Sequence, residues 1–393
     1  MKEIKNIGVF FGGKSPEHDI SVITGQLIIS VLKKMPEYNV IPVYLDKQEK
    51  FFIAGDLGSL SFFSVEGYQN KLTKFGAYSL DLDLSKDCLV FSKGNLLSKK
   101  TIKIDLVFPA FHGNLGEDGS MQGLLNIFGV PYVGCEVAAS GIAMNKILTK
   151  IFYQGLGVPT TKFLSYNRSQ WEEKKNIILG EIKNNLKWPV FVKPPHLGSS
   201  IGITKVTKEP DLEQACEVAL HYDDELLVEE SVENLVDVTC AVRGYKNPQA
   251  SLLQESSFNS DLFSYEDKYL NDGGAQLGQA DKKIIIPANL DEVTTKNIQE
   301  ASLKIFQSLG CSGIARFDFL YNNVTKQYFA NEINPFPGTL YHHLWQKSGV
   351  EIDQLVRGLI NDALVRQSEK ENSTYSFSSE VLGRLKGLKL ARK

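Results

Sequence analysis

The first 46 residues alternate between two kinds of hydrophobic pattern. Residues 4–13 and 38–46 are short apolar runs, and the first of them ends in glycines. Between them, residues 17–35 carry apolar side chains at the spacing of an amphipathic helix. A strand, a glycine turn, a helix and a second strand in this order predict a parallel, doubly wound sheet, so the fold class is α/β.

The rest of the first domain follows the same logic around an insertion. Residues 47–103 are turn-rich and contain short alternating segments such as "SLDLDL", which predict hairpins inserted into the domain. A buried strand is expected at 104–113, where it ends in a glycine-rich loop. A helix at 119–129 and a short strand at 130–134 then complete the domain.

From residue 138 the pattern changes to helices and meandering strands. Residues 138–157 predict a helix, 188–206 a strand, a glycine-rich turn and a strand, 211–224 a helix, and 225–232 a strand. A third section is expected to hold strands at 236–245, 248–258, 282–290 and 316–334, with helices at 291–309 and 350–370. The basic tail, 378–393, is interpreted as a solvated surface helix.

Composition narrows the class of protein. The chain has 393 residues, 42% hydrophobic and 23% charged, which is enough for two or three globular domains. The formal net charge of -3 gives no general attraction to nucleic acid or to an anionic membrane, so neither is expected as a partner. Five scattered cysteines, no signal peptide and no apolar run of about 18 residues predict a cytoplasmic protein with reduced thiols.

The segment Gly8–Ser15 formally fits the phosphate-loop pattern G-x-x-x-x-G-K-[ST]. The bulky residues 9–11 continue the strand instead of curling around a phosphate, so we interpret the segment as a glycine turn that leads into a helix. The N-terminus of that helix is expected to face a ligand, with Glu17 placed to receive an ammonium group. The alternative is that Glu17 only stabilises the helix dipole.

Oxygen-bearing side chains interrupt two apolar strands near the C-terminus. Asp318 lies on the first strand, and Glu332 and Asn334 lie two residues apart on the second, so they share a face. Because an unpaired buried carboxylate is costly, a divalent cation such as Mg²⁺ is one explanation, since it prefers hard oxygen ligands. Arg316 would then lie beside the metal, where it suits an anionic oxygen. A network of salt bridges among the same side chains is the other explanation, and the sequence leaves both open.

Three further segments carry candidate chemistry. Lys193 ends a strand before the turn Gly198–Gly202, whose amides and hydroxyls suit a phosphate, and Lys146 would add a second ammonium group. The strand "LLVEES" contains Glu229 and can offer its backbone to an adenine edge. His112 lies in the glycine-rich loop "FHGNLGEDGSMQG", and a lone histidine is more often structural than functional.

Six segments, in their order along the chain, resemble the D-alanine–D-alanine ligases of the ATP-grasp superfamily. They are "FGGKSPEHDIS", "HGNLGEDGSMQG", "PYVGCEVAAS", "VKPPHLGSSIGITKV", "YEDKYL" and "ARFDF…NEINPFPG", and the resemblance runs from Gly12 to about Leu344. It implies a Rossmann-like domain at 1–134 with its insert at 47–103, a central ATP-grasp subdomain at 135–229 and a C-terminal one at 230–393. ATP would lie between the last two, D-alanine would be the substrate, and the enzyme would be a homodimer.

The resemblance also implies roles for individual residues. Two Mg²⁺ ions, or Mn²⁺ in their place, would be held by Asp318, Glu332 and Asn334. The catalytic set would be Glu17, Ser199, Tyr269, Arg316 and the backbone N–H of Gly338. Substrate contacts would come from Glu17, His112, His343 and Leu344. ATP would be bound by Lys146, Lys193, Gly198, Ser200, Gly202, Glu229, Glu230, Val232, Asp237 and Lys268, with Asp237 at the ribose.

The implied reaction is the formation of D-alanyl-D-alanine for peptidoglycan precursors through an acyl phosphate. The segment 258–274, which contains Lys268 and Tyr269, is the expected lid that excludes water. Three positions depart from the family pattern: Asn145 stands where Asp is usual, Pro335 where Thr is usual, and His343 where a Ser holds the second substrate. A ligase with another acceptor, such as D-serine, D-lactate or a different amino acid, therefore remains an alternative.

Two other classes are less favoured by the residues present. A nucleotide-binding regulator without catalysis would be expected to lack Lys193, Arg316 or Glu332, and all three are in place. A ligase of the biotin carboxylase type would need a bicarbonate site instead of Glu17.

Overall fold

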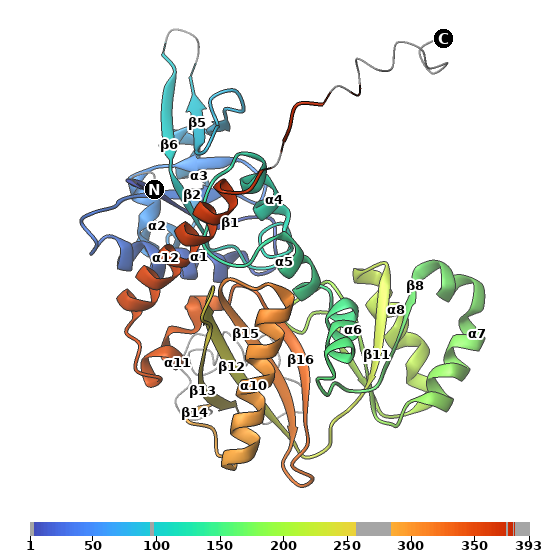
Figure 1. Ribbon diagram of the computed structural model, residues 1–393. Coiled ribbons are helices and arrows are strands. Elements are labelled where there is room, and N and C mark those ends of the chain that lie inside the picture. The colour runs from blue at the N-terminus through green and yellow to red at the C-terminus, as the bar shows by residue number, and fades with distance from the viewer. Residues whose placement is uncertain (1–3, 95–97, 257–283, 375, 380, 382–393) are drawn as a thin grey trace.

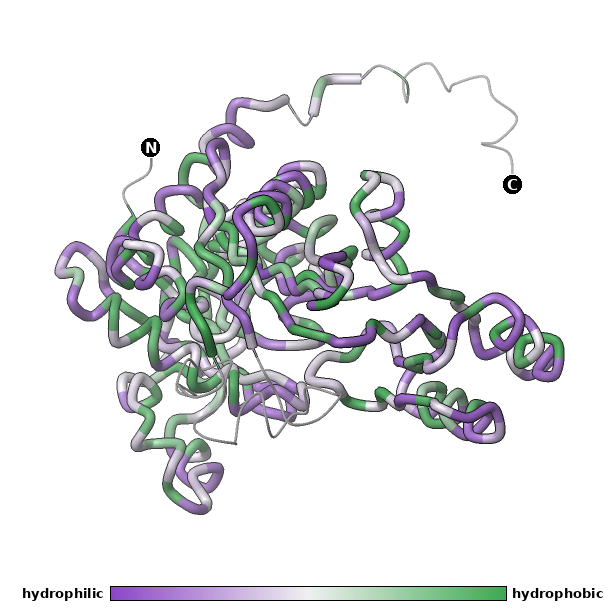
Figure 2. Tube along the Cα trace, turned by 90° about the horizontal axis from the view of Figure 1, so that it is seen from below, coloured by the Kyte–Doolittle hydropathy of each residue, from purple (hydrophilic) through white to green (hydrophobic). Residues whose placement is uncertain are grey.

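The computed structural model describes residues 4–94, 98–256, 284–374, 376–379 and 381, which form three lobes (Figure 1). Hydrophobic segments run through the interior of the lobes, and hydrophilic segments lie on outer loops and helix faces (Figure 2). Among these residues no helix is both long and apolar enough to cross a membrane.

The first lobe is built on a sheet of order β3-β2-β1-β7, in which β1 is parallel to both β2 and β7. Helix α1 connects β1 to β2, so the predicted parallel sheet is confirmed. The elements of this layer are β1 (Asn6–Gly12), α1 (His18–Leu32), β2 (Asn39–Leu45), β3 (Phe51–Ile53), β7 (Leu106–Pro109) and α4 (Ser120–Ile127). Residues 9–11 are buried within β1, as expected for a strand and not for a phosphate loop.

The insert into this lobe is partly as predicted. Strands β4 (Ser79–Leu80), β5 (Leu89–Lys93) and β6 (Lys100–Ile104) form an antiparallel sheet, and the β5–β6 hairpin projects from the lobe (Figure 1). The hairpin prediction is therefore confirmed for the second half of the insert. The first half begins with β3, which forms an antiparallel hairpin with β2, and continues with short helices that the sequence pattern did not predict: η1 (Gly55–Gly58), α2 (Leu60–Phe63) and α3 (Tyr68–Phe75).

The second lobe is an antiparallel sheet of order β10-β9-β11-β8 covered by helices α7 and α8. Its elements are β8 (Phe163–Asn167), α7 (Arg168–Asn185), β9 (Val190–Lys193), β10 (Thr204–Val206), η2 (Glu209–Asp211), α8 (Leu212–Tyr222) and β11 (Glu225–Glu230). The helical structure expected over 138–157 consists of two helices, α5 (Val137–Ala143) and α6 (Lys146–Leu156). The break comes at Asn145, which has an extended backbone conformation. Its side chain caps the N-terminus of α6 by accepting hydrogen bonds from backbone N–H groups of the first turn.

The third lobe contains an antiparallel sheet of order β14-β13-β12-β15-β16 with helix α10 packed against it. Its strands are β12 (Leu235–Gly244), β13 (Gln249–Ser256), β14 (Ile284–Ile285), β15 (Gly313–Asn322) and β16 (Tyr328–Asn334). Its helices are α10 (Glu292–Leu309), η5 (Gly338–Tyr341), α11 (His342–Lys347) and α12 (Ile352–Glu371).

Helix α12 packs against the first lobe although it belongs to the end of the chain (Figure 1). Its buried residues, including Leu355 and Leu359, share one hydrophobic core with Ile28 and Leu32 of α1. The buried side chain of Arg366 donates hydrogen bonds to the carbonyl oxygens of Tyr132 and Gly134, at 2.6 Å each. The first and third lobes are therefore joined by a continuous core, which fixes their relative position.

Candidate active site

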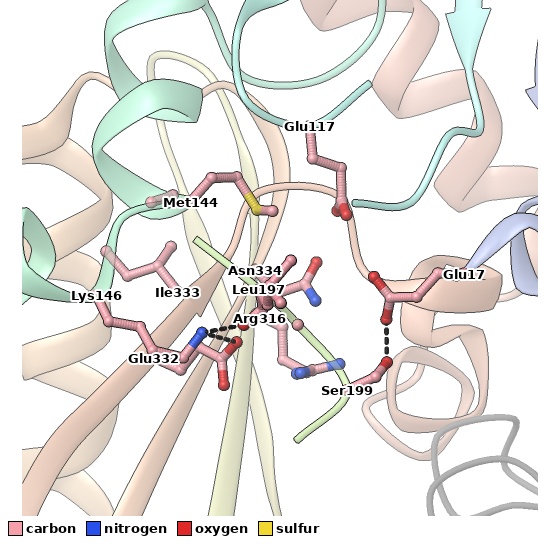
Figure 3. Close-up of a pocket in the computed structure, with 12 residues that line it drawn as sticks. Glu17, Glu117, Met144, Lys146, Leu197, Ser199, Arg316, Glu332, Ile333 and Asn334 are labelled. Carbon is pink, nitrogen blue, oxygen red and sulfur yellow. Dashed lines mark hydrogen bonds and ion pairs between the residues drawn. The ribbon is translucent and has the colours of Figure 1, made fainter. Parts of the chain in front are cut away.

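A cleft lies where the three lobes meet, with about 430 Å³ of space that is partly open to solvent. Loops of the first lobe, the start of α6, the Gly198–Gly202 turn and the ends of β15 and β16 all contribute to it (Figure 3). Its polar lining consists of Glu17, Glu117, Lys146, Gly198, Ser199, Arg316, Glu332 and Asn334. Seven of these eight residues belong to the set predicted from the sequence, and Glu117 does not.

Glu17 and Ser199 meet across the cleft, although they are 182 positions apart in the sequence. The Ser199 hydroxyl donates a hydrogen bond to the Glu17 carboxylate, and the two side chains point toward each other in Figure 3. Gly198 lies so close that a Cβ there would be 3.1 Å from a Glu17 oxygen. The first lobe and the Gly198–Gly202 turn are therefore held together at a carboxylate that faces the cleft.

The carboxylate-bearing strands pair as the sequence predicted. Asp318 on β15 is directly opposite Glu332 on β16, and Arg316 is opposite Asn334. Glu332 and Asn334 line the cleft, whereas the Asp318 carboxylate is bound by its neighbours. Arg316 donates to both Asp318 oxygens, at 2.9 and 2.7 Å, and the Thr239 hydroxyl donates at 3.0 Å. Both explanations offered by the sequence thus have a counterpart here, an Arg–Asp pair and two oxygen-bearing side chains that face the cleft.

Arg316 is buried, and its planar side chain is held in one orientation. The guanidinium lies 5.2 Å from the centre of the Tyr341 ring, in addition to its three hydrogen bonds to Asp318. Burial opposes the charge, but the Asp318 carboxylate outweighs it and holds the pKa of Arg316 above its ordinary value. Its second terminal nitrogen has no hydrogen-bond partner among the residues that the structure describes. That nitrogen suits an anionic oxygen in the cleft.

Asn334 contributes an oxygen to the cleft when its amide is oriented to satisfy its hydrogen bonds. In that orientation the nitrogen donates to Glu117 Oε1 and to the carbonyl oxygen of Phe336, both at 3.1 Å. The amide oxygen is then the atom that would serve as a metal ligand. Carboxylate and amide oxygens are the donors that Mg²⁺ prefers, so the residues present fit this ion.

A buried cluster of charges lies between α6 and β11. Glu229 is 1% exposed, forms ion pairs with Lys150 at 2.5 Å and with Lys193, and accepts a hydrogen bond from Thr161. Burial would raise the pKa of Glu229, but the charges of Lys150 and Lys193 outweigh it and hold the pKa far below its ordinary value. The side chain expected to face adenine is therefore an anion that holds Lys193. The sequence analysis did not identify Lys150.

Lys146 connects three parts of the cleft. Its ammonium group lies 3.7 Å from the Glu332 carboxylate and donates to the carbonyl oxygen of Leu197 at 2.6 Å. The turn that follows Leu197 has an unusual backbone, because Ser199 and Ser200 adopt positive φ values of 54° and 60°. Such strain in residues other than glycine is often found where a backbone is shaped for a ligand.

Glu117 is the lining residue that the sequence analysis missed. It lies in the loop that follows β7, is fully buried, and accepts a hydrogen bond from the backbone of Gly113 at 2.6 Å. Burial raises the pKa of Glu117 above its ordinary value. His112 lies behind it, with Nδ1 3.8 Å from the Glu117 carboxylate and Nε2 2.9 Å from the Thr24 hydroxyl. His112 therefore supports Glu117 and does not line the cleft itself.

His343 and Leu344 both lie on α11, where His343 is half-buried and Leu344 is buried. The His343 Nε2 atom lies 2.7 Å from the Gln254 side-chain oxygen. Burial, followed by the charges of His342 and Arg316, lowers the pKa of His343 to about 4, so the imidazole is neutral. The Leu344 side chain is 0% exposed and belongs to the hydrophobic core. The Leu344 side chain therefore does not reach the cleft, where the expected contact with substrate would lie.

The remaining predicted residues are less directly placed. Glu230 points to the opposite face of β11 from Glu229, and its carboxylate accepts a hydrogen bond from the Lys187 backbone at 3.0 Å. Within the described part of the chain, none of the following lines the cleft: Lys193, Ser200, Gly202, Val232, Asp237, Gly338. Lys268 and Tyr269, together with the rest of the expected lid from residue 258, lie outside the described residues.

Comparison with known proteins gives two family matches that together cover most of the chain. Residues 6–135 match the model described as the D-ala D-ala ligase N-terminus, and residues 152–361 match the model of the D-ala D-ala ligase C-terminus. The D-alanine–D-alanine ligase of Thermosipho melanesiensis is 37% identical over 367 residues, which is 93% of this chain and 95% of the relative. That of Natranaerobius thermophilus is 33% identical, over 96% of this chain and 100% of the relative.

Solved structures lead to the same family. The D-alanine–D-alanine ligase of Coxiella burnetii superimposes with a TM-score of 0.76 at 27% identity, covering 94% of this chain and 97% of that one. The VanG D-Ala:D-Ser ligase of Enterococcus faecalis gives a TM-score of 0.77 at 28% identity, covering 92% and 99%.

Proposed function

This chain belongs to the D-alanine–D-alanine ligase family, which has the ATP-grasp fold, and on that premise we propose that it joins two D-alanine molecules into D-alanyl-D-alanine. ATP is converted to ADP and phosphate, and the dipeptide serves peptidoglycan synthesis. The observation that carries the proposal is the cleft itself. One carboxylate for an ammonium group, Glu17, faces the same space as Lys146, Arg316 and Glu332, which suit phosphate, oxyanion and metal.

We assign the nucleotide to the side of the cleft formed by Lys146 and the Gly198–Gly202 turn. Backbone amides and hydroxyls in a turn with positive φ values suit phosphate oxygens. Lys193 would supply a second ammonium group. Because Glu229 also pairs with Lys150, Glu229 keeps a buried counter-charge when Lys193 turns toward a phosphate. The adenine and ribose contacts proposed for Glu230, Val232 and Asp237 rest on the family resemblance.

We assign two Mg²⁺ ions, or Mn²⁺ in their place, to Asp318, Glu332 and Asn334. When bound, these ions would neutralise the charge on the terminal phosphates and orient the phosphoryl group for transfer. Glu332 and Asn334 already offer oxygens to the cleft. Asp318 would have to share its carboxylate between an ion and Arg316, which is compatible with a carboxylate because its two oxygens accept several bonds.

The first chemical step joins phosphate to the first D-alanine. Its ammonium group would be held by Glu17, which Ser199 orients. A carboxylate oxygen then attacks the terminal phosphorus of ATP, the bond from that phosphorus to the bridging oxygen breaks, and ADP leaves. The product is D-alanyl phosphate. Two anions must meet in this step, so the cations around the cleft lower the barrier by offsetting their repulsion.

The second step forms the peptide bond. The neutral amine of the second D-alanine attacks the carbonyl carbon of the acyl phosphate, and a tetrahedral oxyanion develops. The terminal nitrogen of Arg316 that has no partner among the described residues, together with the backbone N–H of Gly338, is assigned to that oxyanion. The C–O bond to phosphate then breaks, and phosphate leaves with one oxygen of the first D-alanine and with the proton that the attacking nitrogen loses. Water would hydrolyse the acyl phosphate, so closure over the cleft is required, and Lys268 and Tyr269 are assigned to it by resemblance.

One observation favours an acceptor other than D-alanine. His343 replaces the family's usual serine, and it is neutral and half-buried. The VanG D-Ala:D-Ser ligase, whose structure is similar to this one, is named for an acceptor other than D-alanine, which supports this alternative. Incubation of the enzyme with ATP, Mg²⁺, D-alanine and each of D-serine, D-lactate and other amino acids separates the two proposals. We expect D-alanyl-D-alanine as the main product, and a mixed product as the main one would refute this expectation.

The oligomeric state is a separate proposal. The resemblance supports a homodimer formed through the first lobe, and light scattering after size exclusion tests it. A mass of two chains is expected, and a mass of one chain at all concentrations used in the assay would refute it.

A further inference from the structure

A chain of three polar side chains connects the start of α6 to the loop before the Gly198–Gly202 turn. The Asn145 amide nitrogen lies 2.9 Å from His196 Nε2, and His196 Nδ1 lies 3.0 Å from both oxygens of Asp223. Asp223 also accepts a hydrogen bond from the His196 backbone at 3.0 Å. Asn145 comes directly before Lys146, and Leu197 comes directly after His196, so the chain joins two walls of the cleft.

The orientation of the Asn145 amide is fixed by the helix that it caps. Its oxygen accepts hydrogen bonds from the backbone of Ile147 at 2.9 Å and of Leu148 at 3.0 Å. These two N–H groups are donors without partners in the first turn of α6, so the oxygen must face them. The amide nitrogen, which can only donate, is therefore the atom that faces His196. His196 Nε2 can meet it only as an acceptor, in the neutral imidazole.

The other side of the ring favours a proton. The Asp223 carboxylate accepts from Nδ1, and Asp223 raises the pKa of His196 above its ordinary value, with weaker contributions from Glu225 and Asp224. The Asp118 carboxylate of the first lobe lines the same hollow as His196, and the Lys146 ammonium group of α6 lies near it. The charged and titratable groups around the ring are Asp118, Tyr222, Asp223, Asp224 and Glu225, and the Lys146 ammonium group lies at the neighbouring Leu197.

Two more contacts depend on this connection. The Lys146 backbone N–H donates to the carbonyl oxygen of Pro195 at 3.1 Å, and the Lys146 ammonium group donates to that of Leu197 at 2.6 Å. Both carbonyl groups belong to residues adjacent to His196. A shift of the His196 loop away from Asn145 would therefore move Lys146 and Ser199 relative to each other.

We propose that His196 is a positioning residue for nucleotide binding, and that it acts only as a neutral imidazole that accepts a hydrogen bond from Asn145. Protonation places an N–H group against the N–H group of Asn145, whose amide cannot rotate without uncapping α6. The loop that carries the Gly198–Gly202 turn then separates from the start of α6. The proposal rests on the assignment of ATP to this cleft, and it concerns binding of the nucleotide rather than the identity of the amino acids.

The test is the dissociation constant of ATP with Mg²⁺, measured by calorimetry between pH 5.5 and 8.5 without D-alanine. Loss of one hydrogen bond corresponds to about a two- to tenfold weaker affinity. We expect the wild-type constant to rise by about that factor at acid pH, relative to His196→Gln. Glutamine offers the same acceptor and donor without a titratable proton. Protonation of ATP itself affects both proteins equally and therefore cancels in the comparison. The matched control is His221→Gln, which removes a histidine from the exposed surface of the same lobe.

Asn145→Asp is the second variant, and it keeps the test decisive if His196→Gln does not fold. One aspartate oxygen can cap α6 while the other accepts the proton of a charged His196, so the acid-side loss of affinity should disappear. The proposal is overturned if either variant keeps the wild-type pH dependence. It is also overturned if His196→Gln binds ATP more weakly by one constant factor at every pH, or if the wild-type protein binds no ATP. A protein that binds ATP but forms no dipeptide refutes the proposed function and leaves this test unchanged.

Discussion

Replacement of Glu229 by glutamine is expected to destabilise the second lobe severely. Glu229 is the single carboxylate between two ammonium groups, of which Lys150 is 1% and Lys193 8% exposed. The variant Glu229→Gln keeps the size of the side chain and one acceptor oxygen for Thr161 or a lysine. It removes the negative charge, so two buried ammonium groups then face each other without a counter-charge.

The magnitude follows from the burial of this cluster. Loss of one partner of a buried ion pair costs about 3–5 kcal/mol, because the remaining charge is left in a site of low polarity. We expect about 3 kcal/mol here, since the glutamine oxygen still accepts a hydrogen bond. For a slope of about 1.5 kcal/mol per molar urea, this lowers the midpoint of unfolding by about 2 M.

Urea unfolding followed by tryptophan fluorescence measures this loss, because Trp171 is buried in the core of the same lobe. Burial lowers the pKa of Lys150, so in Glu229→Gln the unpaired lysine loses its proton as the pH rises. The loss of stability relative to wild type should therefore shrink from pH 7 to pH 10. The double variant Lys150→Met/Glu229→Gln removes the carboxylate together with one of the two ammonium groups, so only Lys193 is left without its partner, and it should be more stable than Glu229→Gln alone. Equal stability of wild type and Glu229→Gln, or additive losses in the double variant, would refute the reasoning.

Three further predictions concern the cleft. Ser199→Ala removes the hydrogen bond to Glu17, so the KM for the first D-alanine should rise about tenfold. The dissociation constant of ATP should stay within about twofold of the wild-type value. An equal loss of affinity for both ligands would contradict this role of Ser199. Glu332→Gln should lower kcat by about 10²-fold or more with an unchanged circular dichroism spectrum, because the proposed metal site loses a charge, and unchanged phosphate release would overturn that assignment. His343 should stay neutral above pH 5 because burial lowers its pKa to about 4, so the ratio of D-alanine to D-serine incorporation should be constant from pH 6 to 9; a histidine-like transition in that ratio would contradict it.

Most elements were predictable because their hydrophobic period is clear. The pairing of Asp318 with Glu332 followed from two apolar strands joined by a short turn, and the structure has this register. Helix α7 was missed because only a few of its 18 residues, among them Trp171 and Ile182, are buried apolar side chains, so its period is weak. Its start signal was nevertheless present, since Asn167 and Gln170 form a capping box.

The members of the site that were missed depend on distant partners. Lys150 lies one turn after Lys146 on α6, and a helical lysine is usually exposed. Its burial results from Glu229, which a strand 79 positions later brings to it. Glu117 lies in a loop whose glycines were noted, but its burial depends on how that loop folds over His112 and meets Asn334. Neither arrangement is encoded in a local pattern.

In the proposed reaction, a D-alanine carboxylate takes the terminal phosphoryl group of ATP within the cleft. D-alanine labelled with ¹⁸O in both carboxylate oxygens tests this claim most directly, with mass spectrometry of the phosphate released during dipeptide synthesis. Because the acyl phosphate breaks at its C–O bond, we expect one ¹⁸O atom in each phosphate and one in the carbonyl group of each peptide bond. Unlabelled phosphate released together with the dipeptide would contradict it.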